Sequence, residues 1–200
     1  MKKEQRFKYL SYPQAVFVVG TYDGERKPNV MTVALGGMCS HNPPYFAISV
    51  RSATYSHQNI VARQAFTVNI PSKKYLKHVD YVGLVSGRNT DKFAVCGLTA
   101  VAGELVDAPY IDEFPTVAEC RLHQTIDLGS HTMFIGEIVS IKGEEPVLAD
   151  LSHLMPNLTD IPDMVKAEGI VYAFAGDGRY YCGLGEPLER AYSVGRQLIE

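Results

Sequence analysis

The stretch AVFVVGTYDGERKPNVMTVAL, residues 15–35, consists of two apolar runs separated by a turn signal. Asp23-Gly24 lies between the runs, and an Asp-Gly pair in this position is typical of a β-hairpin. Both runs are rich in the β-branched and aromatic residues that favour strands. The stretch therefore predicts two antiparallel strands joined by a turn and a short loop.

The same pattern of short apolar runs between turn residues continues along most of the chain. Further strands are expected at YFAISVR, AFTVNI, LTAVAGELVDAP, TVAECRLHQTIDLG and HTMFIGEIVSIKGEE, with a strand pair around GIVYAFAGDGRYYCGLG. Helices are expected at SATYSHQNIVARQ, SKKYLKHVDYVGLVSG and RAYSVGRQLIE. The spacing of the strands predicts an all-β protein with a few helices, built as an antiparallel barrel or sandwich.

Composition and charge exclude several classes of protein. The 200 residues are 46% hydrophobic and 20% charged, with no internal repeat and no linker that would divide the chain. The longest apolar runs are far shorter than the roughly 20 residues of a membrane span, and the N-terminus lacks the apolar core of a secretory signal. We therefore expect no membrane association and a cytoplasmic location.

Lys and Arg are scattered, and the net charge is -3. A nucleic-acid binder needs a basic surface, so this class is disfavoured; retention on single-stranded DNA at low salt would revive an oligonucleotide-binding barrel. The four cysteines, Cys39, Cys96, Cys120 and Cys182, are too far apart for a structural zinc site or a disulfide framework. We expect reduced, mostly buried thiols and no bound metal.

The segment VRSATYSHQNI, residues 50–60, is the first candidate site. Arg51 ends a predicted strand, and Ser52, Thr54, Ser56 and His57 follow at the start of a predicted helix. The unpaired N–H groups of a helix N-terminus attract anions, and hydroxyls and a guanidinium add further donors. The segment is a plausible phosphate cradle. The alternative is that Ser and Thr only cap the helix while Arg51 is a solvated strand end.

A second candidate is PNVMTVALGGMCS, residues 28–40. Asn29 and Thr32 lie on a strand that continues into Gly36-Gly37, a pair that permits a bulge or a close backbone approach. Such a strand could present amides and carbonyls to a flat heteroaromatic ring. The alternative is an ordinary β-bulge with solvent-facing Asn and Thr.

Two further segments carry polar residues at unusual places. In SGRNTDKFAVCGL, residues 86–98, Asp91 could cap a helix and Lys92 is among the first residues able to reach inwards, although a lone Lys is usually on the surface. In LGSHTMFIGEI, residues 128–138, a Gly-Ser-His trio precedes a run that otherwise indicates a buried strand. The trio suggests a close backbone approach with the His131 imidazole directed at it. No metal-ligand cluster, catalytic triad or dinucleotide-binding glycine pattern is present.

The order of these motifs resembles the flavin reductase-like, FMN-binding split-barrel family. NVMTVA is followed by S-x-NPP, FAISV, a Ser/Thr-bearing turn with NI, F-x-VNIP, SGR…DKF…GL, and GSH…FIGEI. The resemblance extends from about Phe7 to Gly185, and the length and the final segment look most like the flavoredoxins. It implies a single domain over residues 1–200, with a C-terminal extension from about 150 to 200.

This resemblance implies a six-stranded antiparallel Greek-key split barrel, a homodimer, and FMN bound non-covalently near the subunit interface. Asn29 and Thr32 would contact the flavin, and Ser56 and the turn from Arg51 to Thr54 would hold the phosphate. Lys92 would supply a positive charge, either at the phosphate or near the pyrimidine edge.

The flavin ring has three further candidate neighbours under the same resemblance. His131 would lie by the isoalloxazine ring. Leu35 stands where some relatives carry a Trp that covers the ring, and this chain has no Trp. Met164 lies in the segment LMPNLTDIPDMV, which would either fold over the flavin or form a surface loop. Glu137 is expected to serve an interface or a turn.

The implied activity is redox chemistry carried by FMN. NAD(P)H or a reduced partner protein would supply electrons, which FMN would pass to an acceptor, with no essential acid or base among the side chains. The sequence leaves open whether the protein turns over a nicotinamide or carries electrons between proteins. A different possibility is a flavin-binding module, a sensor or cofactor store, without turnover.

Overall fold

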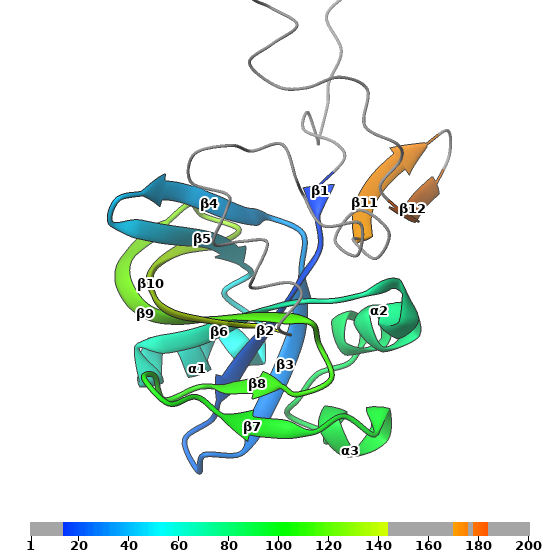
Figure 1. Ribbon diagram of the computed structural model, residues 1–200, viewed down its shortest axis with the longest axis horizontal. Helices are drawn as coiled ribbons and strands as arrows, with labels where there is room; N and C mark the ends of the chain where they lie inside the picture. The colour runs from blue at the N-terminus through cyan, green and yellow to red at the C-terminus, as the bar shows by residue number, and fades with distance from the viewer. Residues whose placement is uncertain (1–13, 144–169, 176–177, 184–200) are drawn as a thin grey trace, which may run out of the picture.

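The computed structural model describes residues 14–143, 170–175 and 178–183 (Figure 1). Its strands are β1 (Gln14–Ala15), β2 (Phe17–Tyr22), β3 (Pro28–Val33), β4 (Gly36–His41), β5 (Pro44–Val50), β6 (Ala65–Ile70), β7 (Ala100–Ala102), β8 (Pro109–Ile111), β9 (Thr116–Asp127), β10 (Thr132–Gly143), β11 (Ile170–Ala175) and β12 (Gly178–Gly183). Its helices are α1 (Tyr55–Arg63), α2 (Leu76–Leu84) and α3 (Lys92–Cys96), with a short 3-10 turn, η1 (Lys73–Tyr75), before α2.

A seven-stranded antiparallel sheet, in the order β3-β2-β6-β9-β10-β5-β4, forms the main body. The sheet curls into a barrel (Figure 1). The barrel encloses one buried hydrophobic cluster, to which β2, β3, β5, β6, β9 and β10 all contribute side chains. The Ser49 N–H also donates to the Leu35 carbonyl at 2.8 Å, which links β5 to the chain just after β3. The prediction of an all-β antiparallel barrel with a few helices is confirmed.

The strand count differs from the six that the resemblance implied. The predicted strand through residues 28–40 breaks at Ala34-Leu35, and Gly36–His41 forms a separate strand, β4, which pairs with β5 as a hairpin. The register shifts between Met38 and Ser40, so a bulge does lie close to the glycine pair. The additional strand is therefore β4.

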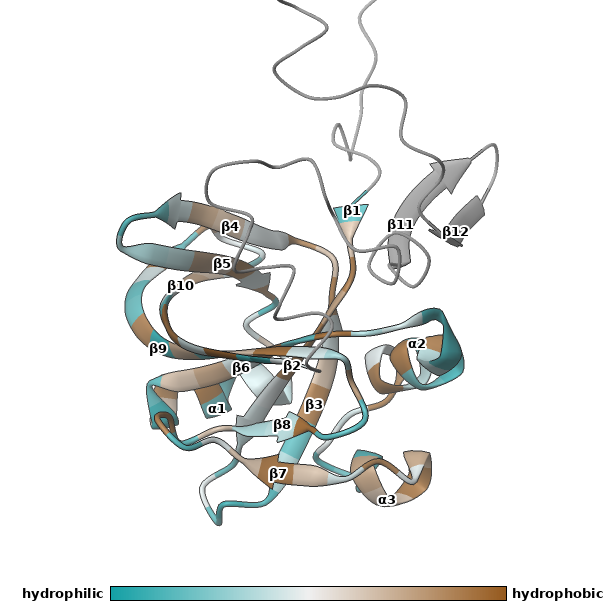
Figure 2. Cartoon of the chain, in the orientation of Figure 1, coloured by the Kyte–Doolittle hydropathy of each residue, from teal (hydrophilic) through white to brown (hydrophobic). Residues whose placement is uncertain are grey.

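Both faces of the β2–β3 hairpin are covered. Side chains of a strand alternate between its faces, so Val19 and Val33 point into the barrel while Val18 and Val30 point outwards. The outward side chains pack against α2, α3 and β8 in a second cluster that includes Val79, Val82, Phe93 and Ile111. Hydrophobic residues accordingly follow β3 in Figure 2. This double burial explains why AVFVVG is continuously apolar rather than alternating.

Three smaller expectations are corrected. The predicted strand over residues 98–109 is two short strands, β7 and β8, which pair with each other. The stretch after α2, expected to be irregular, contains the short helix α3. The expectation that Asp91 could cap a helix is confirmed, since Asp91 accepts the Ala94 N–H at 3.1 Å. Of the three cysteines with described side chains, only Cys120 is buried; Cys96 is half-buried and Cys39 is exposed.

The predicted strand pair near the end of the chain is confirmed as β11 and β12, which form a three-stranded sheet with β1. The helix expected at residues 190–200 lies outside the described residues. Within the described ranges, no helix has the length and apolar character needed to span a bilayer.

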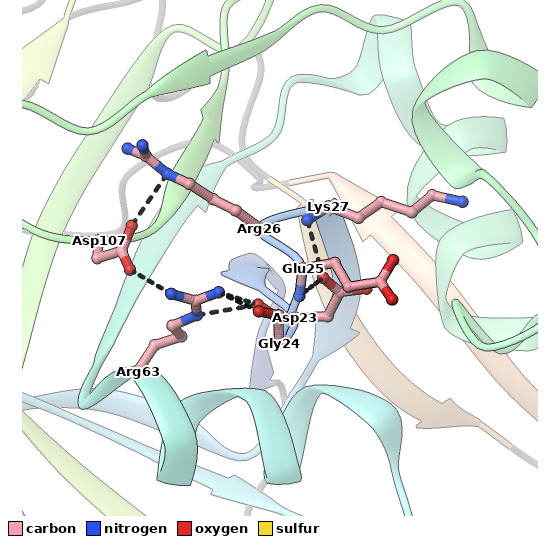
Figure 3. A network of polar contacts seen from close by, with 7 residues as sticks. All are labelled: Asp23, Gly24, Glu25, Arg26, Lys27, Arg63 and Asp107. Carbon is pink, nitrogen blue, oxygen red and sulfur yellow. Dashed lines mark hydrogen bonds and ion pairs between the residues drawn. The ribbon is translucent and has the colours of Figure 1, made fainter.

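A polar network fixes the β2–β3 turn (Figure 3). Asp23 Oδ1 accepts the N–H groups of Glu25 and Lys27 at 2.9 and 2.8 Å. Arg63, at the end of α1, donates from Nε to the Asp23 carbonyl at 2.9 Å and from Nη1 to Asp107 Oδ2 at 3.0 Å. The turn, the end of α1 and the loop before β8 are therefore joined by one guanidinium.

Replacement of this guanidinium tests the network. Arg63→Ala leaves the Asp23 carbonyl and the Asp107 carboxylate without this donor, and we expect the free energy of unfolding to fall by about 1–2 kcal/mol. Urea titration followed by circular dichroism measures the change. Arg121→Ala, at an exposed position on β9, is the control. Equal unfolding midpoints in the two variants would contradict this role of Arg63.

Candidate functional site

The N-terminus of α1 lies directly after β5, at the position where the sequence predicts a phosphate cradle. Thr54 is its N-cap: its hydroxyl accepts the His57 N–H at 3.3 Å and donates to the Arg51 carbonyl at 2.9 Å. The capping interpretation is thus confirmed for Thr54. The N–H groups of the first turn, those of Tyr55 and Ser56, have no acceptor within the helix. Arg51 and Ser52 are exposed, so both side chains are accessible to an anion beside this helix end.

A buried polar cluster supports this helix end. Asn29 Nδ2 donates to Ser56 Oγ at 2.9 Å and to Thr21 Oγ1 at 3.3 Å, and Asn59 Nδ2 donates to the same Thr21 oxygen at 3.2 Å. Asn29 and Ser56 are only 4% and 2% exposed. Asn29 Oδ1 has no hydrogen-bond partner among the described residues. The structure therefore brings Asn29 and Ser56 together, beneath the turn that contains Arg51 and Thr54.

The segment 86–88 packs over the same helix end, and its Arg88 was not among the predicted site residues. Arg88 Nη1 donates to the Ala53 carbonyl at 3.1 Å, and Nη2 donates to Gln58 Oε1 at 3.1 Å. The guanidinium carbon also lies 5.4 Å from the centre of the Tyr55 ring. The only signal in the sequence was the SGR motif, whose partners lie about thirty residues away along the chain.

Two contacts hold the Tyr55 side chain: the Arg88 guanidinium lies over its ring, and its hydroxyl bonds to Asp23. Its hydroxyl donates to Asp23 Oδ2 at 2.7 Å, and this hydrogen bond, followed by burial, raises the pKa of Tyr55. Burial alone would raise the pKa of Asp23, but hydrogen bonds from Tyr55 and from the turn amides hold it below its usual value. Asp23 is therefore a carboxylate at neutral pH, and it anchors the first residue of α1 to the β2–β3 turn.

Thr32 and Lys92 lie on the opposite, outward side of β3. Asn29 and Thr32 are three positions apart, so strand alternation places their side chains on different faces. Thr32 donates to the Val79 carbonyl of α2. Lys92 is 4% exposed, and its Nζ donates to the carbonyls of Val30 and Val82, both at 2.7 Å. The structure thus groups these two residues at the contact of β3 with α2, apart from the α1 cluster.

Burial lowers the pKa of Lys92 to about 8, which predicts a pH-dependent contribution to stability. Below pH 8 the amine is charged in both states, and the cost of burying its charge is fully present. Between pH 8 and 10.5 it is neutral in the fold and charged in the unfolded chain, so this contribution stabilises the fold as pH rises. We expect wild type to gain about 1 kcal/mol of unfolding free energy relative to Lys92→Met between pH 8 and 9.

Denaturant titrations at both pH values measure this difference. The comparison with Lys92→Met removes the opposing effect of Cys120, whose thiol pKa is raised by burial to about 12. Parallel pH profiles for the two proteins would show that Lys92 keeps its ordinary pKa in the fold.

Leu35 borders a cavity of about 470 Å³ at the break between β3 and β4. Gly36 and Gly37 also line this cavity, as do Ser49 of β5 and Met133 of β10. Gly37 has no neighbouring atom within 4 Å of where a Cβ would lie, so its backbone is open to a ligand. A second cavity of about 370 Å³ includes Thr32, and Ala34 lines both. The open backbone expected at the glycine pair is present at Gly37 but not at Gly36, where a Cβ would lie 2.8 Å from the Ala47 carbonyl oxygen.

The Gly-Ser-His trio forms the turn from β9 into β10. Gly129 has a φ of 82°, a left-handed conformation that glycine adopts without a steric penalty. The Leu128 N–H donates to the His131 carbonyl at 2.9 Å, and His131 Nδ1 lies 2.9 Å from Ser130 Oγ. Turn geometry therefore explains the small residues at the entrance to this strand.

His131 precedes β10 at the end of the sheet where β5 leads into Arg51. Thr132, the first residue of β10, pairs with Val50, the last residue of β5. His57 connects the same region to α1, since its Nε2 lies 2.8 Å from Thr132 Oγ1 and its ring packs on Phe134. The structure thus brings His131 to the side of the predicted phosphate cradle. Met164 lies outside the described residues.

The cavity and the helix end are connected along β5. Ser49 lines the cavity, and Arg51, two residues further, precedes the anion-accessible turn. Arg51 and the first-turn amides of α1 are hydrogen-bond donors, and the cavity has an open backbone at Gly37. This fold and site suit a ligand that has a flat ring at one end and a phosphate at the other.

Comparison with known proteins assigns the family. The model of the flavin reductase like domain matches residues 9–159, and the chain therefore belongs to the flavin reductase-like family. The solved flavoredoxin of Desulfovibrio vulgaris (Miyazaki F) is 44% identical, with a TM-score of 0.81 over 98% of this chain and 100% of that one. An FMN-binding protein from Thermus thermophilus, 20% identical, has the same fold, with a TM-score of 0.74 over 94% and 96% of the two chains.

Two sequence relatives carry functional names. A high molecular weight rubredoxin of Moorella thermoacetica is 33% identical over 109 residues, which are 52% of this chain and 46% of that protein. An NADH-dependent FAD reductase of Streptomyces globisporus is 29% identical over 132 residues, 64% of this chain and 69% of that protein. FMN is the cofactor that fits this family and fold. Among the described residues, no cluster of His, Cys, Asp or Glu could hold a metal ion.

Proposed function

We propose that this protein is an FMN-dependent redox protein. FMN would bind with its phosphate at the N-terminus of α1 and its ring in the cavity beside Leu35. The observation that carries this arrangement is the connection along β5, where the cavity-lining Ser49 is followed two residues later by Arg51. The proposed cofactor-binding residues are Asn29, Thr32, Leu35, Arg51, Thr54, Ser56, Lys92, His131 and Met164.

The residues would serve different parts of the cofactor. Arg51 and the first-turn amides of α1 would bind the phosphate, with Thr54, Ser56 and Asn29 holding that turn in place. Leu35 would cover part of the ring and exclude water from it. His131 would stand at the ring edge; its Nδ1 already faces Ser130, so Nε2 is the nitrogen for a ligand.

Lys92 would act through its charge. It lies behind β3, with two N–H groups bonded to backbone carbonyls, and its ammonium would favour negative charge on a bound flavin. Its pKa of about 8 makes this charge decrease at alkaline pH. Met164 stays a prediction from the sequence resemblance, because it lies outside the described residues.

FMN, when bound, supplies the hydride and electron chemistry, and the chain supplies binding, orientation and electrostatics. We propose that NAD(P)H or a reduced partner protein is the electron donor and that a second molecule accepts the electrons. The two named relatives support each type of donor, since one is an NADH-dependent reductase and the other a rubredoxin. We also propose a cytoplasmic homodimer with FMN near the subunit interface.

An anaerobic visible spectrum of the FMN-reconstituted protein tests this function. We expect the flavin absorbance to bleach on addition of NADH or NADPH, which also identifies the preferred nucleotide. Bleaching by reduced rubredoxin, but by neither nucleotide, would establish a carrier supplied by another protein. A retained flavin that only dithionite bleaches would support the alternative of a flavin-binding module, and a protein that retains no flavin would contradict the proposal.

A further inference from the structure

Arg88, in segment 86–88, packs on the outer side of the predicted phosphate cradle. Arg88 contacts three parts of one structure: the Ala53 carbonyl in the turn, Gln58 on α1, and the ring face of Tyr55. A guanidinium is planar and has donors in a fixed fork, so it can hold two acceptors at once while stacking on a ring. These contacts position the turn relative to the helix.

Thr54 and Arg88 bond to the two ends of one peptide group in the turn. Thr54 donates to the Arg51 carbonyl from its N–H at 3.0 Å and from its hydroxyl at 2.9 Å. Arg88 holds the opposite end of the same peptide group, the Ala53 carbonyl. With both ends bonded, the peptide plane between Ala53 and Thr54 is fixed. The first-turn amides of α1, which follow directly, are thereby presented in one orientation.

No carboxylate in the described part of the chain neutralises the charge of Arg88. Its described acceptors are a carbonyl and an amide oxygen, both neutral, and it forms no ion pair with any side chain in the described part of the chain. By contrast, the partly buried Arg63 is paired with Asp107. An unpaired guanidinium beside a helix N-terminus adds to the positive potential of that helix end.

We propose that Arg88 is a positioning residue that makes this site selective for phosphorylated flavin over riboflavin. It fixes the Ala53–Thr54 peptide group and adds unneutralised positive charge, and both effects favour a phosphate monoester without touching the flavin ring. This inference rests on the proposed function, because it assumes that the phosphate of FMN lies at α1.

The dissociation constants of FMN and of riboflavin, measured by quenching of flavin fluorescence, test the proposal. We expect Arg88→Ala to weaken FMN binding about tenfold, the effect of losing charge-assisted hydrogen bonds, while riboflavin binding changes less than about twofold. Arg88→Lys retains the charge but cannot form the same fork, so it should recover only part of the loss. Gln58→Ala, which removes one acceptor of the fork, should also weaken FMN binding and spare riboflavin.

Arg121→Ala is the matched control, because it removes an exposed arginine from β9 and should leave both constants unchanged. An equal loss of FMN and riboflavin binding in Arg88→Ala would show a merely structural role and overturn the proposal, as would no loss at all. If wild type binds neither flavin, the proposed function itself fails; if wild type prefers FMN and Arg88→Ala keeps that preference, only the role of Arg88 fails.

Discussion

Gly20→Ala is expected to lower the free energy of unfolding by about 3 kcal/mol or more, since overpacking against rigid backbone is costly. Gly20 is central in β2, and a Cβ there would lie 2.1 Å from the Pro109 carbonyl oxygen and 2.4 Å from Thr67 Oγ1. These two atoms are themselves hydrogen-bonded at 2.6 Å. Neither can move without separating β8 from β2 and β6. Urea titration measures the effect as a lower midpoint at an unchanged m-value.

Gly24→Ala is the control for this prediction. Gly24 lies in the turn after β2, has no atom within 4 Å of an added Cβ and does not adopt a positive φ. Its replacement should change stability by less than about 0.5 kcal/mol, as is usual for exposed positions. If the midpoints of the two variants coincide, the close contact between β2 and β8 does not exist in solution.

Gly87→Ala is expected to weaken FMN binding about tenfold or more, which corresponds to about 1.4 kcal/mol or more. A Cβ at this position would lie 2.0 Å from Asn29 Oδ1 and 3.0 Å from Tyr55 Cδ1. The methyl group would push segment 86–88 away from the buried polar cluster and remove Arg88 from the turn. Fluorescence quenching of FMN measures the affinity, and circular dichroism checks that the barrel remains folded.

Gly97→Ala is a useful comparison. Gly97 ends α3 with a φ of 62°, and nothing lies within 4 Å of an added Cβ, so its replacement strains the backbone without touching the site. It should lower stability slightly and leave the FMN dissociation constant unchanged. Equal FMN affinity in Gly87→Ala and wild type would show that segment 86–88 is not part of the cofactor site.

Local patterns account for most of the fold. The Asp-Gly turn, the strands before and after α1 and the long strands β9 and β10 were predictable, because strand periodicity and turn residues act over short distances. The separate strand β4 was not predictable, since the break at Ala34-Leu35 has no strong turn signal and depends on pairing with β5. The short helix α3 was missed because five residues give too little periodicity.

The site divides in the same way. Ser56 could be placed at the predicted phosphate turn because the start of the helix was predictable. Asn29 was expected at the flavin, and its hydrogen bond with Ser56 exists only after folding. Thr32 could have been assigned to the other face of β3 from strand alternation alone. The role of Arg88 could not be predicted from its neighbours in the sequence, because its contacts with Ala53 and Gln58 exist only after folding.

The position of β3 at the edge of the sheet has a consequence for solubility. An edge strand offers unpaired carbonyls and amides to which a strand of another molecule can add, and natural proteins protect such edges with lysines and covering helices. Here the carbonyl of Val30 is occupied by the ammonium of Lys92, and α2 and α3 pack beside the strand. The buried amine of Lys92, whose pKa is about 8, therefore occupies a carbonyl to which a strand of another molecule would otherwise bond. Such intermolecular strand addition is a precondition of fibrillar aggregation.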